Sequence, residues 1–159
     1  MSQESTVLTS VRLGDDPALQ TALFERADVF AMTQAAEEAV LRPVQPGGLS
    51  HELRHALAAR IAAQNGLADL AARYAGGAGS ELQPICDPAH LPEGKLRVIA
   101  SFMDDVACNP RDVTADDVTH LQEGGTSDAD IVRLAELNAF MAYQCRLVTG
   151  LRLMAGGVA

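Results

Sequence analysis

The clearest hydrophobic pattern in the chain lies in residues 49–74, LSHELRHALAARIAAQNGLADLAARY. Its apolar side chains recur every four residues, at Leu53, Leu57 and Ile61. Because Ser50 stands at an N-cap position, the pattern predicts an amphipathic helix from there. Gly66 can adopt the left-handed conformation that closes a helix, and a second short helix is predicted over residues 67–74. We expect any chemical site to lie at this junction.

Residues 1–14 carry no strong pattern and are predicted to form an irregular arm. Helix is predicted after them. Asp15 and Asp16 precede Pro17, which places acid and proline at a helix start. Apolar spacing then supports helix to about Leu41, as one helix or two. The sequence PVQPGG after Arg42 predicts the turn into the central stretch.

After residue 74, a glycine-rich breaker and the proline-punctuated segment 82–92 predict a long loop. A helix is predicted over residues 96–106, and capping residues at Thr114 and Ser127 open two more. The last of these reaches about Thr149 and carries an apolar seam interrupted by Asn138. No segment alternates with period two, so we predict one all-α domain over residues 15–159, a bundle of about six to seven helices.

Charge and composition restrict the partners. The chain of 159 residues has 12 basic and 21 acidic residues, a net charge of −9, which opposes binding to nucleic acid or to an anionic membrane. It shows neither a membrane-spanning apolar run nor a signal peptide, so a cytoplasmic protein is expected. The three cysteines, Cys86, Cys108 and Cys145, are widely spaced and are expected to be reduced and structural.

Several motifs, taken in order, resemble the carboxymuconolactone decarboxylase and alkyl hydroperoxidase D superfamily, and in particular its peroxidase-related branch. One is PGGLSHELRHALAARIAAQNG; another is the tail from Lys95, with Gly-x-Ser-Asp and a long helix ending in RLVTGL. The resemblance covers about residues 44–152. It implies an all-α fold that assembles into homo-oligomers, trimers or hexamers.

The resemblance also implies that thiol peroxidase chemistry has been lost. Family peroxidases carry a Glu twelve residues before a CxxC, and a His four residues after its second Cys. The corresponding residues here are His55, Leu67, Leu70 and Tyr74. Leucine supplies no thiolate, and thiol–disulfide chemistry requires one. No cofactor is expected.

The residues that remain at the junction suggest acid–base chemistry. His55 and Tyr74 are the principal catalytic candidates, with His51 and Arg54 as weaker ones, because decarboxylation or lactone isomerisation needs proton transfer and groups that hold carboxylates. A hydrogen bond between His55 and Tyr74 would preserve a polar contact at the replaced positions. Alternatively, both residues serve packing, and Tyr74 is a buried tyrosine with a satisfied hydroxyl.

Residues 51–55, HELRH, also match the HExxH pattern of zinc proteases, in which two His on one helix face bind the metal. No third ligand follows in the expected extension. A metal site at His51 and His55 is therefore an alternative rather than the main prediction.

Three hypotheses follow. The first is a superfamily member without CxxC redox catalysis, with non-thiol acid–base chemistry on a small oxidised or carboxylated substrate. The second is a catalytically inactive oligomeric module for binding or scaffolding. The third is the metal protein.

Overall fold

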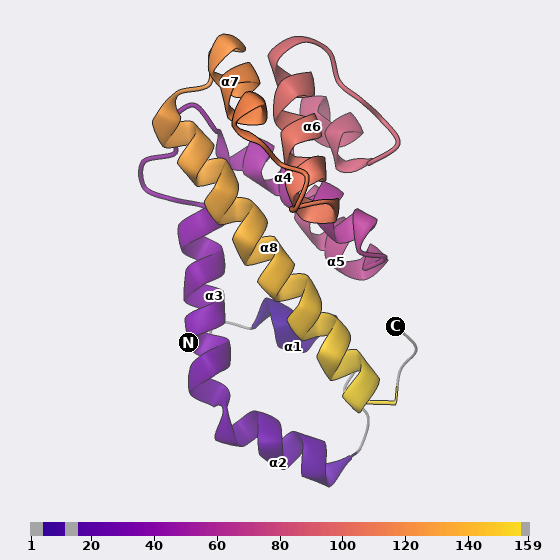
Figure 1. The fold of residues 1–159 in the computed structure, drawn as a ribbon. Helices are drawn as coiled ribbons and strands as arrows, with labels where there is room; N and C mark the ends of the chain where they lie inside the picture. Colours follow the sequence, from indigo (N-terminus) through magenta and orange to yellow (C-terminus); the bar gives the residue numbers. More distant parts are fainter. Residues whose placement is uncertain (1–4, 12–15, 157–159) are drawn as a thin grey trace.

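The computed structural model describes residues 5–11 and 16–156, and every regular element within these ranges is a helix, which confirms the all-α prediction. The elements are α1 (Thr6–Ser10), α2 (Pro17–Glu25), α3 (Ala27–Leu41), α4 (His51–Gln64), α5 (Ala68–Ala75), the 3-10 helix η1 (Ser80–Cys86), α6 (Gly94–Cys108), α7 (Ala115–Glu123) and α8 (Asp128–Met154). In Figure 1, α8 crosses the molecule diagonally, with α2 and α3 at one side and α6 and α7 near its N-terminal end.

The predicted six to seven helices are too few for the described residues, because α1 and η1 were expected to be irregular. Helix α1 lies within the arm predicted over residues 1–14, of which residues 1–4 and 12–14 lie outside the described ranges. Its sequence TVLTS has poor helix formers. Tertiary contacts instead hold it: Val7 is 1% exposed, and the backbone N–H of Thr6 donates to Gln34 Oε1 at 2.8 Å.

Local capping signals locate several helix ends as predicted. The hydroxyl of Ser50 accepts from Leu53 N at 3.2 Å at the start of α4, and Gly66 has a φ of 72° just beyond its end. Residues 17–41 form two helices that meet at Arg26. Asp16 caps the first of them, whereas Asp15 lies outside the described residues.

Helix α4 is buried on every face, so its prediction as an amphipathic helix was wrong. Ten consecutive residues, from Leu53 to Ala62, are buried. The helix contacts α3, α5, η1, α6 and α8. Alanines at four of these ten positions leave room for close neighbours on several sides. The polar members of the run are buried too, so each must find its hydrogen-bond partners inside the protein.

Arg60, fully buried on α4, ties the segment after η1 to the core. Its Nε and Nη2 atoms each donate to the carboxylate of Asp104 on α6 at 2.7 Å. The same guanidinium donates to four backbone carbonyls, that of Ile85 near the end of η1 and those of Asp87, Pro88 and His90 after it. One buried cation therefore binds several backbone oxygens of a segment that lies mostly outside the helices.

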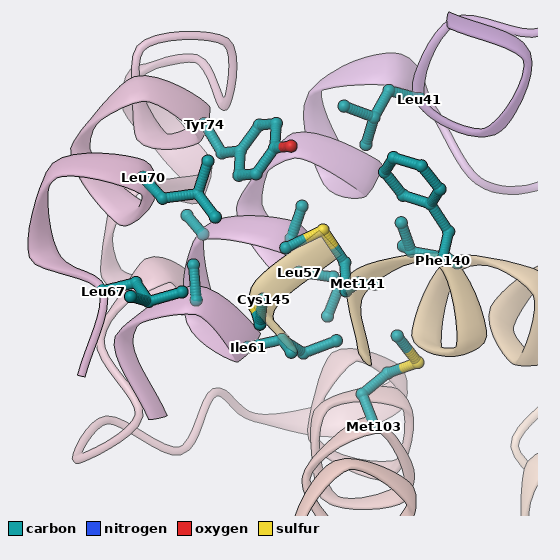
Figure 2. Packing of buried hydrophobic residues seen from close by; sticks show 14 of the residues in the cluster. Leu41, Leu57, Ile61, Leu67, Leu70, Tyr74, Met103, Phe140, Met141 and Cys145 are labelled. Atoms are coloured by element: carbon teal, nitrogen blue, oxygen red, sulfur yellow. The ribbon is translucent and has the colours of Figure 1, made fainter. Parts of the chain in front are cut away.

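Helix α8 packs its apolar seam inside the same chain. Leu134, Met141 and Val148 are fully buried, and the amide of Asn138 donates to the backbone oxygen of Met103 on α6 at 2.8 Å. The polar interruption of the seam thus fixes α8 against α6. Figure 2 shows Met103 of α6 facing Phe140 and Met141 of α8. In the described part of the chain, no helix, including this one of 27 residues, combines the length and the apolar character that a membrane span requires.

Replacing Arg60 with Met tests the importance of this buried cation. We expect Arg60→Met to lower the free energy of unfolding by about 3–5 kcal/mol, because it removes the buried cation that neutralises Asp104, leaving Gln64 as a donor to that carboxylate, and because the loop carbonyls lose their guanidinium donor. Urea unfolding followed by circular dichroism measures the change. Arg111→Met, at an exposed arginine, is the control and should change stability by less than about 0.5 kcal/mol. Equal effects of the two substitutions would contradict this account.

Candidate functional site

A polar pocket of about 340 Å³ lies where α3, α4 and α5 meet. Its lining residues are mostly charged or hydrogen-bonding: Gln34, Glu37, Glu38, Arg42, His55, Arg73, Tyr74 and Gly77. The two main candidates from the sequence, His55 and Tyr74, therefore line one pocket. The charged residues around them come from α3, its C-cap Arg42, and α5.

The imidazole of His55 is held in one tautomer. Its Nδ1 atom lies 2.7 Å from the backbone oxygen of His51, which can only accept, so Nδ1 carries a proton. Its Nε2 atom lies 2.8 Å from Nη1 of Arg42, which can only donate. Nε2 is therefore the acceptor, and the ring is a neutral imidazole with its lone pair on the pocket side.

Gly77 allows the ring to lie where it does. A Cβ atom at this position would be 2.3 Å from Cδ2 of His55 and 2.7 Å from its Cγ, far inside van der Waals contact. The backbone after α5 thus approaches the face of the imidazole directly. A side chain here would require the ring to move.

Tyr74 belongs to a buried polar network rather than to a pair with His55. Its hydroxyl donates to Glu37 Oε2 at 3.0 Å and accepts from Gln144 Nε2 at 2.8 Å. Figure 2 shows this hydroxyl directed away from Leu67 and Leu70. The hydrogen bond between His55 and Tyr74 considered from the sequence does not form among the described residues, since each ring binds other partners.

Glu37 is the centre of that network. It is 3% exposed, and besides Tyr74 it accepts from Thr6 Oγ1, from Gln34 and from Gln144, the last at 2.7 Å. Four neutral donors from four elements thus compensate one buried carboxylate. Burial and the neighbouring Glu37 raise the pKa of Tyr74 far above its usual range, so its phenol stays protonated.

Arg42 joins the two sides of the pocket. Its Nε atom donates to Glu38 Oε2 at 2.7 Å, its Nη2 atom forms a second, very short contact with Oε1, and Nη1 donates to His55. The side chains of Arg42 and Glu38 are 43% and 33% exposed. Their hydrogen bonds raise the pKa of Arg42 and lower that of Glu38, so both remain charged at neutral pH.

The two weaker candidates have structural partners outside the pocket. Arg54 is 2% exposed and donates to the backbone oxygens of Leu49, Val40 and Pro46, which fixes the turn between α3 and α4. His51 donates from Nε2 to the oxygen of Pro43 at 3.0 Å. Neither residue lines the pocket.

The HExxH histidines do not form a metal cluster. The Nε2 atoms of His51 and His55 bind Pro43 and Arg42 respectively. Among the residues that the structure describes, no group of three or more His, Cys, Asp or Glu side chains is arranged to hold a metal ion.

Leu67 and Leu70, the residues that the sequence resemblance aligned with cysteines, lie in the core. Leu67 is 5% exposed and Leu70 fully buried, and both belong to the apolar cluster beside Tyr74 in Figure 2. The three cysteines are free thiols: Cys145 is buried, Cys86 half-buried and Cys108 exposed. Burial raises the pKa of Cys145 to about 11 and also raises that of Cys86.

The sequence did not predict Glu37, Glu38 and Arg42 as site residues. Glu37 and Glu38 lie in the predicted helix that ends near Leu41, and Arg42 begins the predicted turn after it. A signal for Glu37 was present: Phe30, Thr33, Gln34, Glu37 and Leu41 follow helical spacing on the buried face of α3. Polar residues on an otherwise apolar stripe mark a buried network. Glu38 and Arg42 have the i, i+4 spacing of an ordinary surface ion pair, and this spacing does not indicate a pocket.

Comparison with known proteins adds no relative: no family model, no curated protein and no solved structure matches this chain.

Gly77→Ala tests the close approach at His55. The added methyl must displace the imidazole, so we expect His55 to lose the hydrogen bond that it accepts from Arg42 and the one that it donates to His51. Side-chain ¹⁵N spectra should then show a mixture of tautomers instead of one. Gly150→Ala is the control, since a Cβ there meets nothing within 4 Å, and this change in α8 should stabilise the protein by up to about 1 kcal/mol. An unchanged His55 spectrum in Gly77→Ala would contradict the geometry.

Thiol labelling tests the cysteine environments. At pH 8 a disulfide reagent should react rapidly with Cys108, more slowly with Cys86, and with Cys145 only after unfolding, because a buried thiol with a pKa of about 11 is almost fully protonated there. Labelling of Cys145 should increase as the pH rises toward 11. Cys108→Ser should remove the fast phase. Rapid labelling of Cys145 in the native protein at pH 8 would be inconsistent with its burial.

Proposed function

We propose that this protein is an enzyme that transfers a proton at a carbon next to the carbonyl group of a small carboxylic acid, without thiol, metal or redox chemistry of its own. The observation that carries the proposal is the neutral His55, whose unprotonated Nε2 atom faces a polar pocket flanked by arginines. A neutral imidazole in this form is a general base.

The surrounding residues support the same reaction class. Arg42 and Arg73 supply two positive charges at the pocket, which favour a carboxylate and stabilise the negative charge of an enolate. The proton would pass from the substrate carbon to Nε2 and leave an enolate. It would return to the same carbon, which exchanges the proton, or, in a substrate with a C=C bond conjugated to the enolate, to the γ-carbon, which shifts the double bond and amounts to an isomerisation. Nδ1 remains bonded to His51, whose backbone oxygen stabilises the imidazolium formed.

Tyr74 has a positioning role in this proposal. Its phenol stays protonated, so it cannot act as a phenolate base, and Glu37 and Gln144 hold its hydroxyl. The network forms a rigid polar wall on the α5 side of the pocket. Preorganised polar groups of this kind lower the barrier without moving during the reaction.

Membership of the alkyl hydroperoxidase D-like superfamily is part of the proposal. The helical order and the helix–Gly–helix junction at Gly66 support it. Leu67 and Leu70 would then mark the loss of the redox pair, in agreement with a site that uses His55 instead. Assembly into homo-oligomers remains a prediction from the same resemblance.

Deuterium exchange tests the proposed reaction. In D₂O, ¹H NMR of a panel of 2-oxo acids, 3-oxo acids and unsaturated lactone acids should show enzyme-dependent loss of the carbon-bound proton for at least one compound. His55→Gln should lower that rate by about 10²–10⁴-fold, the usual contribution of a general base. His120→Gln, at an exposed histidine, is the matched control and should leave it unchanged.

The same protein should not reduce hydroperoxides with a dithiol. Exchange that survives His55→Gln, or no exchange with any compound in the panel, would refute the proposed function. Cysteine-dependent peroxide reduction would show that the chain retains thiol chemistry.

A further inference from the structure

Arg42 blocks the atom that the proposed function needs. Since Nδ1 of His55 is bonded to His51, only Nε2 can accept a proton, and Nε2 already accepts a hydrogen bond from Nη1 of Arg42 at 2.8 Å. A lone pair that faces a guanidinium N–H cannot abstract a proton from carbon. For catalysis, Arg42 has to move away from the ring.

Glu38 keeps Arg42 in the blocking position. The carboxylate accepts from Nε and Nη2 of Arg42, and the two residues are one helical turn apart, with the backbone N–H of Arg42 donating to the oxygen of Glu38 at 2.8 Å. In this two-pronged contact, Glu38 provides what a bound carboxylate would provide. The pocket thus contains an internal carboxylate, that of Glu38, bound to its own arginine.

The contact between Glu38 and Arg42 can be exchanged, in contrast to the neighbouring Glu37 network. Both partners are partly exposed, at 33% and 43%, and solvent weakens such pairs, so Glu38 can be released into water. Glu37 is 3% exposed, and its four donors are fixed by packing. A ligand therefore competes with Glu38 and not with Glu37.

We infer that Arg42 is a cap on the base His55, and that a substrate carboxylate removes this cap by taking the guanidinium from Glu38. Glu38 is attached to α3 and holds the guanidinium against Nε2, whereas a free carboxylate binds it without that tether and draws Nη1 away from the ring. This role of Arg42 rests on the proposed function and assigns its substrate selection: a compound without a carboxylate, or an equivalent oxyanion, leaves the base blocked. Arg73, exposed on the α5 side of the same pocket, adds positive charge that favours anion entry. A substrate carboxylate must bind Arg42 more tightly than Glu38 does.

Propionate and its neutral analogue propionamide are the probes. In ¹⁵N and ¹³C spectra of histidine side chains, propionate should shift the His55 Nε2 signal as the hydrogen bond from Arg42 is lost, and propionamide should not. Glu38→Gln should tighten propionate binding roughly twofold to fivefold, the range expected when one exposed ion pair is removed. Arg42→Met should abolish the binding and give the uncapped Nε2 signal without any ligand. Glu123→Gln, at an exposed glutamate, should leave the affinity unchanged.

The outcomes separate this inference from the proposed function. Two results would refute the role of Arg42 as a cap: propionate binding at the pocket with a constant His55 signal, or an unchanged affinity for propionate in Glu38→Gln. Neither result would contradict the proposed exchange activity. If propionate binds to neither the wild type nor Glu38→Gln, the cap is refuted as well. An increase of the exchange activity of Arg42→Met on compounds without a carboxylate would support the cap, whereas His55→Gln tests the base independently.

Discussion

The burial of α4 on every face is the constraint on which the remaining structure depends. On a helix surrounded by other elements, every polar side chain needs hydrogen-bond partners inside the protein. The buried run of α4 contains three such side chains, those of Arg54, His55 and Arg60. The two arginines are compensated mainly by backbone oxygens of the segments that flank the helix. The turn before α4 and the segment after η1 are thus organised by cations in the central helix.

His55 differs from the two arginines because its partners leave one side open. One nitrogen is fixed to the backbone of its own helix, and the other faces the pocket and a solvent-accessible arginine. The adjacent network at Glu37 is buried, and its carboxylate accepts hydrogen bonds from four side chains. The site therefore combines a fixed polar wall with one exchangeable ion pair, and this division separates the residues that position a ligand from the residues that respond to it.

Local signals in the sequence predicted the parts of the fold that depend on neighbouring residues. Ser50 and Gly66 located the ends of α4, and the position of Tyr74 near His55 followed from one helix–turn–helix unit. Contacts between distant segments could not be predicted. Glu37 meets Gln144, 107 residues away, and Arg60 meets carbonyls 25 to 30 residues later. Such partners make a charged residue compatible with burial, and a single sequence does not display them.

The short helix α1 links the beginning of the described chain to the pocket. The hydroxyl of Thr6 donates to the same carboxylate of Glu37 that holds Tyr74, and Ser10 accepts from Arg152 near the end of α8. Fusion partners or truncations that displace α1 would therefore remove a donor from the wall of the site, even though the sequence of the pocket itself stays intact. For recombinant work, an affinity tag close to residue 6 is not a neutral choice, and its removal should precede any measurement of ligand binding.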